Sequence, residues 1–169
     1  MDFTTSLPRT LLIANGNDDE VLFFMWALKT AGIDRSADFV SSGPQAVSYL
    51  QDSITDLCVA SQVQVLLLLD DQIPLMNALQ VLVWIRSQPA LKSLSVYMFA
   101  SSPLAADISR AKRFGVREYW VKPSNPGPRQ FMDLALKLKA IIQPGAIPSS
   151  GLERSRHHSH AREQARAFT

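Results

Sequence analysis

One stretch of the sequence, Val63–Pro74, constrains the fold more than any other. Its first seven residues are apolar except for Gln64, and they lead directly into Asp70 and Asp71. An apolar run of this length without alternation predicts a strand buried on both faces, as in parallel sheets that helices cover on both sides. The two carboxylates then lie at the carboxyl end of a central strand, where open α/β sheets bind ligands. On position alone, two Asp residues that simply end a core strand are an equal alternative.

Around this stretch the sequence alternates between expected strands and expected helices. The strands are expected at 10–14, 38–40, 63–69, 95–100 and 118–121, and the helices at 21–30, 44–50, 76–87, 104–114 and 131–142, with 51–61 as a polar connection. This alternation predicts a parallel sheet with right-handed crossovers. Five units predict a doubly wound α/β fold of the flavodoxin-like kind, with a five-stranded parallel sheet of order 2-1-3-4-5 and helices on both faces. In that order the turn at Asn15 and Gly16 should face Asp70.

Length and composition predict one domain with short extensions. We expect residues 10–143 to form the domain, after an N-terminal extension of residues 1–9 and before a basic, flexible tail of residues 144–169. Apolar residues make up 47% of the 169-residue chain, too many for a disordered protein. No apolar run approaches the roughly 20 residues that span a bilayer, and no signal-peptide core is visible, so we expect a cytoplasmic protein. Cys58, the single cysteine, excludes an internal disulfide.

The charge of the chain is concentrated in its tail. The formal net charge is +2, and the four Arg and two Glu from Gly151 onward account for all of it. A neutral domain argues against a nucleic-acid-binding core. The tail also carries His157, His158 and His160; a basic arm on nucleic acid or on an acidic partner, or a histidine metal site, are minor alternatives for it.

Several motifs, taken in order, resemble those of receiver domains of bacterial two-component response regulators. Asp70 with Pro74 fits the phosphoacceptor Asp and the turn after it, and Lys122-Pro123 fits the Lys-Pro after the fifth strand. The other matches are 74–78 (PLMNA), 43–47 (GPQAV), and 11–19 (LLIANGNDD), which is similar to the opening of stand-alone regulators that serve phytochrome-type kinases. The resemblance covers roughly residues 10 to 143, and its specificity comes from the order and spacing of the motifs.

The resemblance implies roles for particular residues. Asp70 would be the nucleophile and the site of phosphorylation, because a carboxylate that attacks a phosphoryl group forms an acyl phosphate. Lys122 would neutralise the charge that develops on the phosphoryl oxygens. The family also uses Mg²⁺, which Asp70 and the backbone carbonyl of Gln72 would help to hold. Tyr119 would occupy the aromatic switch position.

Two departures from the family pattern damage this site. The acidic pair expected after the first strand aligns with Ala14 and Asn15, so Mg²⁺ binding should be weak. The next acidic residues, 18 and 19, match their own counterparts at the start of the helix and are not taken as substitutes. The hydroxyl residue expected at the end of the fourth strand aligns with Ala100; the neighbouring Ser101 should point to the other face, since side chains alternate along a strand.

Two functional hypotheses remain open. In the first, the chain is a stand-alone response regulator in a two-component phosphorelay, impaired in phosphorylation at Asp70, with a sensor histidine kinase, of the phytochrome type as one case, or a phosphotransfer protein as partner. In the second, it is a pseudo-receiver that acts as an interaction or dimerisation module without phosphorylation. Neither hypothesis makes it an enzyme beyond phosphoryl transfer to its own Asp70.

The first expected helix bears on the dimerisation alternative. Residues 21–28 are all apolar, and Val21, Phe24, Met25 and Leu28 are expected on its buried face. Leu22, Phe23 and Trp26 would then lie at the sides or outside, either covered by neighbouring helices or available for self-association or for a partner.

Overall fold

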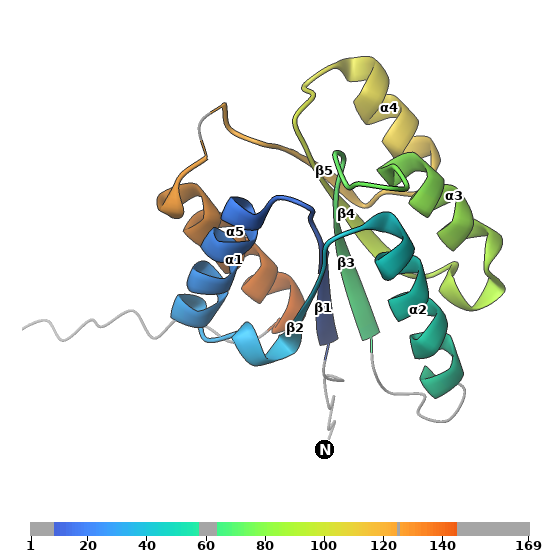
Figure 1. The fold of residues 1–169 in the computed structure, drawn as a ribbon, viewed down its shortest axis with the longest axis horizontal. Helices are drawn as coiled ribbons and strands as arrows, with labels where there is room; N and C mark the ends of the chain where they lie inside the picture. Colours follow the sequence, from blue (N-terminus) through green and yellow to red (C-terminus); the bar gives the residue numbers. More distant parts are fainter. Residues whose placement is uncertain (1–8, 58–63, 125, 145–169) are drawn as a thin grey trace, which may run out of the picture.

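The computed structural model describes residues 9–57, 64–124 and 126–144, which form a five-stranded sheet between two layers of helices (Figure 1). The strands are β1 (Arg9–Ala14), β2 (Ala37–Val40), β3 (Gln64–Asp70), β4 (Ser95–Ala100) and β5 (Glu118–Val121). The helices are α1 (Asp18–Ala31), α2 (Gly43–Leu57), α3 (Ala78–Ser87), α4 (Ala105–Arg113) and α5 (Pro128–Ile142), with short 3₁₀ turns at Asp34–Ser36 and Pro89–Leu91.

The sheet order is β2-β1-β3-β4-β5, and all four strand pairs are parallel, as the sequence predicts. Helices α1 and α5 cover one face, and α2, α3 and α4 cover the other (Figure 1). The register pairs Ala14 with Leu69 and Asp70 with Phe99. The carboxyl ends of β1, β3 and β4 therefore meet at one edge of the sheet.

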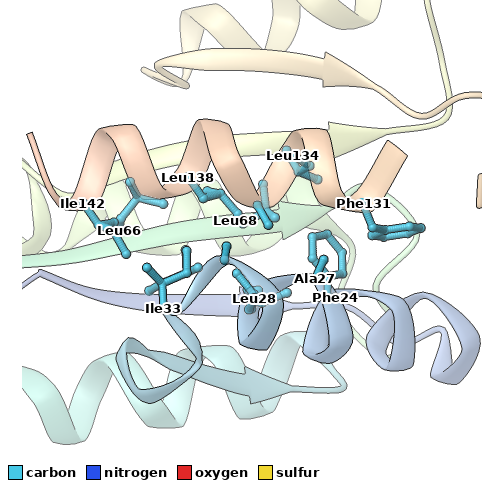
Figure 2. Close-up of a cluster of buried hydrophobic side chains, with 14 of the residues drawn as sticks. Phe24, Ala27, Leu28, Ile33, Leu66, Leu68, Phe131, Leu134, Leu138 and Ile142 are labelled. Carbon is cyan, nitrogen blue, oxygen red and sulfur yellow. The ribbon is translucent and has the colours of Figure 1, made fainter. Parts of the chain in front are cut away.

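Strand β3 is buried on both faces, as its unbroken apolar run predicts. Leu66 and Leu68 belong to the core under α1 and α5, whereas Leu67 and Leu69 belong to the core on the opposite face. Figure 2 shows the first of these cores, in which side chains of α1 and α5 lie close to Leu66 and Leu68 of β3. The ring of Phe24 lies edge-on to Phe131, with 4.6 Å between centroids. Burial of this kind is the main stabilising contribution to such a fold.

Several helix bounds differ from the sequence prediction. Helix α1 begins at Asp18 rather than 21, because the Asn17 side chain accepts a hydrogen bond from the Glu20 N–H and caps the helix. Helix α2 extends to Leu57, so the expected polar connection at 51–61 is wrong up to that residue. Helix α3 begins at Ala78, where Asn77 and Gln80 form a reciprocal capping box.

The apolar face of α1 was predicted only in part. Phe24 and Leu28 are buried, but Met25 is exposed, so its expected place on the buried face is wrong. Phe23 packs on Phe131, with ring centroids 5.4 Å apart. Leu22 and Trp26 lie on the exposed face together with Met25.

Some predictions fall on residues outside the described ranges. These are Cys58, most of the N-terminal extension, and the tail from residue 145 with its three histidines. Within the described residues, no helix combines the length and the apolarity needed to cross a membrane.

Candidate functional site

Asp70 ends β3 and is only 3% exposed. Its Oδ1 accepts a hydrogen bond from the Gln72 N–H at 2.9 Å, and its Oδ2 lies 2.6 Å from the Nζ of Lys122. Each oxygen of this buried carboxylate therefore has a hydrogen-bond donor. The structure thus brings Asp70 and Lys122, both singled out in the sequence, into direct contact.

Lys122 reaches Asp70 from the residue after β5. Its backbone N–H donates to the carbonyl of Ala100 at 2.7 Å, which extends the β4–β5 ladder by one bond. Its ammonium lies over the ring of Phe99, 5.1 Å from the centroid, and the side chain is 8% exposed. Such a buried ammonium requires anionic partners.

The second anionic partner of Lys122 is Glu20, a residue that the sequence analysis missed. Its Oε2 and Oε1 lie 2.9 and 3.2 Å from Lys122 Nζ. Glu20 is buried in the first turn of α1, whereas Asp18 and Asp19 beside it are exposed. The ammonium of Lys122 thus lies between two carboxylates that come from β3 and α1.

Asn15 explains why Glu20 points toward the site. In a capping box, the Glu at the third helical position would accept the backbone N–H of the capping residue, here Asn17. Instead, Asn15 Oδ1 accepts the Asn17 N–H at 2.8 Å, and Asn15 Nδ2 donates to Glu20 Oε2 at 2.7 Å. The Asn15 amide therefore replaces Glu20 at the cap and holds its carboxylate against Lys122.

A sequence signal for Glu20 existed, but it was ambiguous. The spacing Asn17-x-x-Glu20 is that of a capping box, which predicts a local role for Glu20 at the helix start. Only the competition from Asn15 redirects the side chain. Asn15 and Asp70, expected to face one another, are in fact connected through Glu20 and Lys122.

The environment shifts the pKa values of this network. Burial raises the pKa of Asp70, and the hydrogen bonds from Lys122 and Gln72 oppose this shift without cancelling it. For Lys122, burial acts to lower the pKa, but the hydrogen bonds and charges of Asp70 and Glu20 outweigh it and raise the pKa. Lys122 is therefore held as the charged ammonium.

Asp71 turns toward β4 instead of toward Lys122. Its Oδ2 accepts the Ser101 N–H at 3.0 Å, and its Oδ1 is buried without a hydrogen-bond partner. Its proximity to Asp70 adds to the raised pKa of that carboxyl. Asp71 therefore ties the ends of β3 and β4 together.

The predicted switch positions do not form a hydroxyl site. Ala100 is fully buried, and the neighbouring Ser101 is exposed with its N–H bonded to Asp71. The Tyr119 hydroxyl donates to the Ser102 carbonyl at 2.9 Å. Burial, with the charges of Asp71 and Asp107, raises the pKa of Tyr119, so its hydroxyl stays protonated as a donor.

The loop after β3 packs closely against Gly16, in the loop after β1, and against Gly43 at the start of α2. The Pro74 ring lies where a Cβ on Gly16 would be, and Met76 lies where a Cβ on Gly43 would be. Between them, Leu75 has a φ of 67° and is 88% exposed, and the Met76 N–H bonds to the Pro74 carbonyl at 2.9 Å. Glycine at positions 16 and 43 is therefore required by the close approach of this loop.

The residues present do not fit a divalent metal site of the family kind. The positions expected to supply carboxylates hold Ala14, which is buried in the core, and Asn15, whose amide is engaged with Glu20 and Asn17. In the part of the chain that the structure describes, no three His, Cys, Asp or Glu side chains converge as a metal-holding group. Asp70 and Glu20 are instead bridged by an ammonium.

The sheet order, with Asp70 at the end of β3 and Lys122 directly after β5, matches the fold of response regulator receiver domains. Among solved structures, the chain is similar to the phosphorylated cyanobacterial phytochrome response regulator RcpA, with 23% identity and a TM-score of 0.67 over 85% of this chain and 99% of that one. It is also similar to the Mn²⁺-bound form of the response regulator Rcp1, with 20% identity and a TM-score of 0.67 over 84% of this chain and 100% of that one.

A third similar structure is a response regulator in red light signalling of R. palustris, with 27% identity and a TM-score of 0.63 over 83% of this chain and 97% of that one. No protein-family model matches the sequence, and no curated protein matches it. The resemblance to receiver domains predicted from the sequence is confirmed at the level of structure.

Proposed function

We propose that this chain is a stand-alone receiver-like response regulator of a two-component phosphorelay, which acts through protein contacts and in which phosphorylation at Asp70 is possible but impaired. The observation that carries the proposal is the ion pair between Asp70 Oδ2 and Lys122 Nζ at 2.6 Å, at the carboxyl end of the central strand of a receiver fold. A cytoplasmic location fits this function.

The chemistry of this pair supports phosphoryl transfer to Asp70. A carboxylate oxygen of Asp70 would attack the phosphorus of a donor, form the new P–O bond of an acyl phosphate, and release the donor's leaving group with the electrons of the broken bond. The Lys122 ammonium would lie beside the charge that spreads over the phosphoryl oxygens. The chain is not otherwise an enzyme under this proposal.

The kind of partner is proposed from the similar structures. Two of them are regulators of phytochrome or red light signalling. A sensor histidine kinase of that type, or a phosphotransfer protein, is therefore the phosphodonor that we propose. A homodimer through the exposed apolar residues of α1, Leu22, Met25 and Trp26, is a second kind of contact that the surface supports.

A second function is favoured by the damaged parts of the site. Ala100 has no hydroxyl group, and Ala14 and Asn15 have no charge. Glu20 already forms an ion pair with the ammonium of Lys122. These features support a pseudo-receiver, a protein interaction or dimerisation module that works without phosphorylation.

The experiment that separates the two functions is intact mass spectrometry after incubation with acetyl phosphate, in Mg²⁺ and in a chelator. The variants are Asp70→Asn and Asp71→Asn, which changes the adjacent carboxylate and keeps an oxygen for the Ser101 N–H. One added phosphoryl group on the wild type and on Asp71→Asn, but not on Asp70→Asn, supports the receiver. An unmodified wild type in both conditions contradicts phosphorylation and leaves the pseudo-receiver.

A further inference from the structure

We infer that Glu20 is a built-in counterion of Lys122. It holds the ammonium beside Asp70, so that this site does not take up a divalent cation. The inference starts from the position of Lys122 Nζ, which lies 2.6 Å from Asp70 and 2.9 Å from Glu20. The ammonium occupies the space between the two carboxylates closest to it. A divalent cation that bound to both would have to displace it.

The hydrogen bonds of Glu20 hold its carboxylate in a defined position beside Lys122. Both carboxylate oxygens contact Lys122, and Oε2 also accepts from Asn15 Nδ2 at 2.7 Å. The side chain is 11% exposed, so water competes little with these contacts. An oxygen already held by an ammonium and an amide is a poor ligand for a hard cation.

The charge of the network leads to the same conclusion. Asp70 and Glu20 carry two negative charges, and Lys122 neutralises one of them within hydrogen-bond distance of both. The remaining negative charge is weak attraction for a cation that must lose part of its hydration shell. Of the adjacent Asp71, Oδ2 is held toward β4 by the Ser101 N–H, and only Oδ1 is left without a hydrogen-bond partner.

Asn15 and Glu20 act together in this arrangement. An amide at position 15 can accept the Asn17 N–H and donate to Glu20 at the same time, which a carboxylate cannot do. The neutral residue at the end of β1 is thus a requirement of the Glu20 position. The biological consequence rests on the proposed receiver function: metal occupancy of the site beside Asp70 would not change with the cellular Mg²⁺ concentration.

The test measures Mn²⁺ binding by electron paramagnetic resonance of the free ion and by the shift of Tm, against a KCl control of equal ionic strength. We expect the wild type to bind Mn²⁺ with a Kd weaker than ~1 mM. Lys122→Met, which frees both carboxylates, should bind at least about 10-fold more tightly. Adding Glu20→Gln to Lys122→Met should abolish that gain, whereas adding Asp19→Asn, an exposed carboxylate of the same turn, should keep it.

Two results would overturn the inference. Submillimolar binding of Mn²⁺ by the wild type would contradict the inference, and loss of that binding in Glu20→Gln would show in addition that Glu20 is a metal ligand. Lys122→Met that folds and still fails to bind would show that the ammonium does not exclude the cation. If Lys122→Met does not fold, the comparison of the wild type with Glu20→Gln still decides the first point. Because none of these readouts requires phosphoryl transfer, a failure of phosphorylation is distinguishable from a failure of this inference.

Discussion

The side-chain amide of Asn15 donates to the carboxylate of Glu20 at 2.7 Å, a contact between the end of β1 and the first turn of α1 that both residues make while buried. The contact depends on the amide being a donor. An Asp at position 15 would keep an acceptor for the Asn17 N–H but would place one carboxylate against another.

Asn15→Asp should therefore destabilise the protein at neutral pH. The lost hydrogen bond and the new repulsion between buried carboxylates should lower the free energy of unfolding by roughly 1–3 kcal/mol. The matched control is Asn17→Asp, which adds the same charge at an exposed capping position where Asp is equally suitable. Denaturant unfolding measures both. Equal stability of the two variants would contradict the role of the amide.

The raised pKa of Asp70 predicts how the free energy of unfolding depends on pH. An Asp in the unfolded chain loses its proton near the ordinary value of 3.8, whereas folded Asp70 keeps its proton to higher pH. The native state therefore binds more protons in this window, and the contribution of Asp70 to the free energy of unfolding falls as pH rises through it. Asn does not titrate, and Lys122 keeps Glu20 as its partner.

We compare the free energies of unfolding of Asp70→Asn and of the wild type. Their difference, variant minus wild type, should increase from pH 3.8 upward and become constant above the pKa of folded Asp70. Thermal unfolding across acidic to neutral pH measures this difference, in which the other carboxylates largely cancel. A difference that decreases with rising pH would mean that the ion pair with Lys122 outweighs the cost of burying Asp70.

Arg86 should be a strong determinant of stability although it lies outside the site. From α3 its guanidinium donates to the carbonyls of Phe114 and Gly115, at 2.9 and 2.8 Å, and to those of residues 91, 92 and 94 at 3.3 Å. It thereby connects the segments that precede β4 and β5. Arg86→Lys keeps the charge but cannot reproduce this fork of donors, so we expect a loss of about 1–3 kcal/mol in the free energy of unfolding. Arg110→Lys, on the exposed surface of α4, should change it by less than about 0.5 kcal/mol.

Gly16 should not tolerate a side chain while Pro74 is present. A Cβ at position 16 would overlap the Pro74 ring and approach the Ser41 carbonyl at 3.1 Å. Gly16→Ala should therefore cost about 1–3 kcal/mol by forcing the loop away. The double variant Gly16→Ala with Pro74→Ala removes the ring and should cost less than the sum of the single variants, which a double-mutant cycle measures. Additive effects would show that the two residues do not press on one another.

Much of the fold was predictable because it depends on patterns that repeat along the chain. The unbroken run of β3 predicted its burial on both faces, the alternation of strands and helices predicted a parallel sheet, and the five units predicted the flavodoxin-like order that the structure shows. The bounds of β4 and β5 were correct, whereas the start of α1 was missed because it depends on a cap, a single contact that carries no periodicity. The positions of Asp70 and Lys122 followed from the same regular elements, since each lies at a strand end.

The role of Glu20 was decided by the tertiary structure alone. Its sequence context offered two bonding possibilities, the backbone of Asn17 and an ion pair with a lysine 102 positions away. The choice depends on which group the Asn15 amide satisfies, and on β5 bringing Lys122 to the end of β3. The sequence determines by its periodicity where the strands and helices lie and most of their buried faces, because these depend on patterns that repeat along the chain. Where a side chain has both a local and a distant partner, only the packed structure determines which of them it takes.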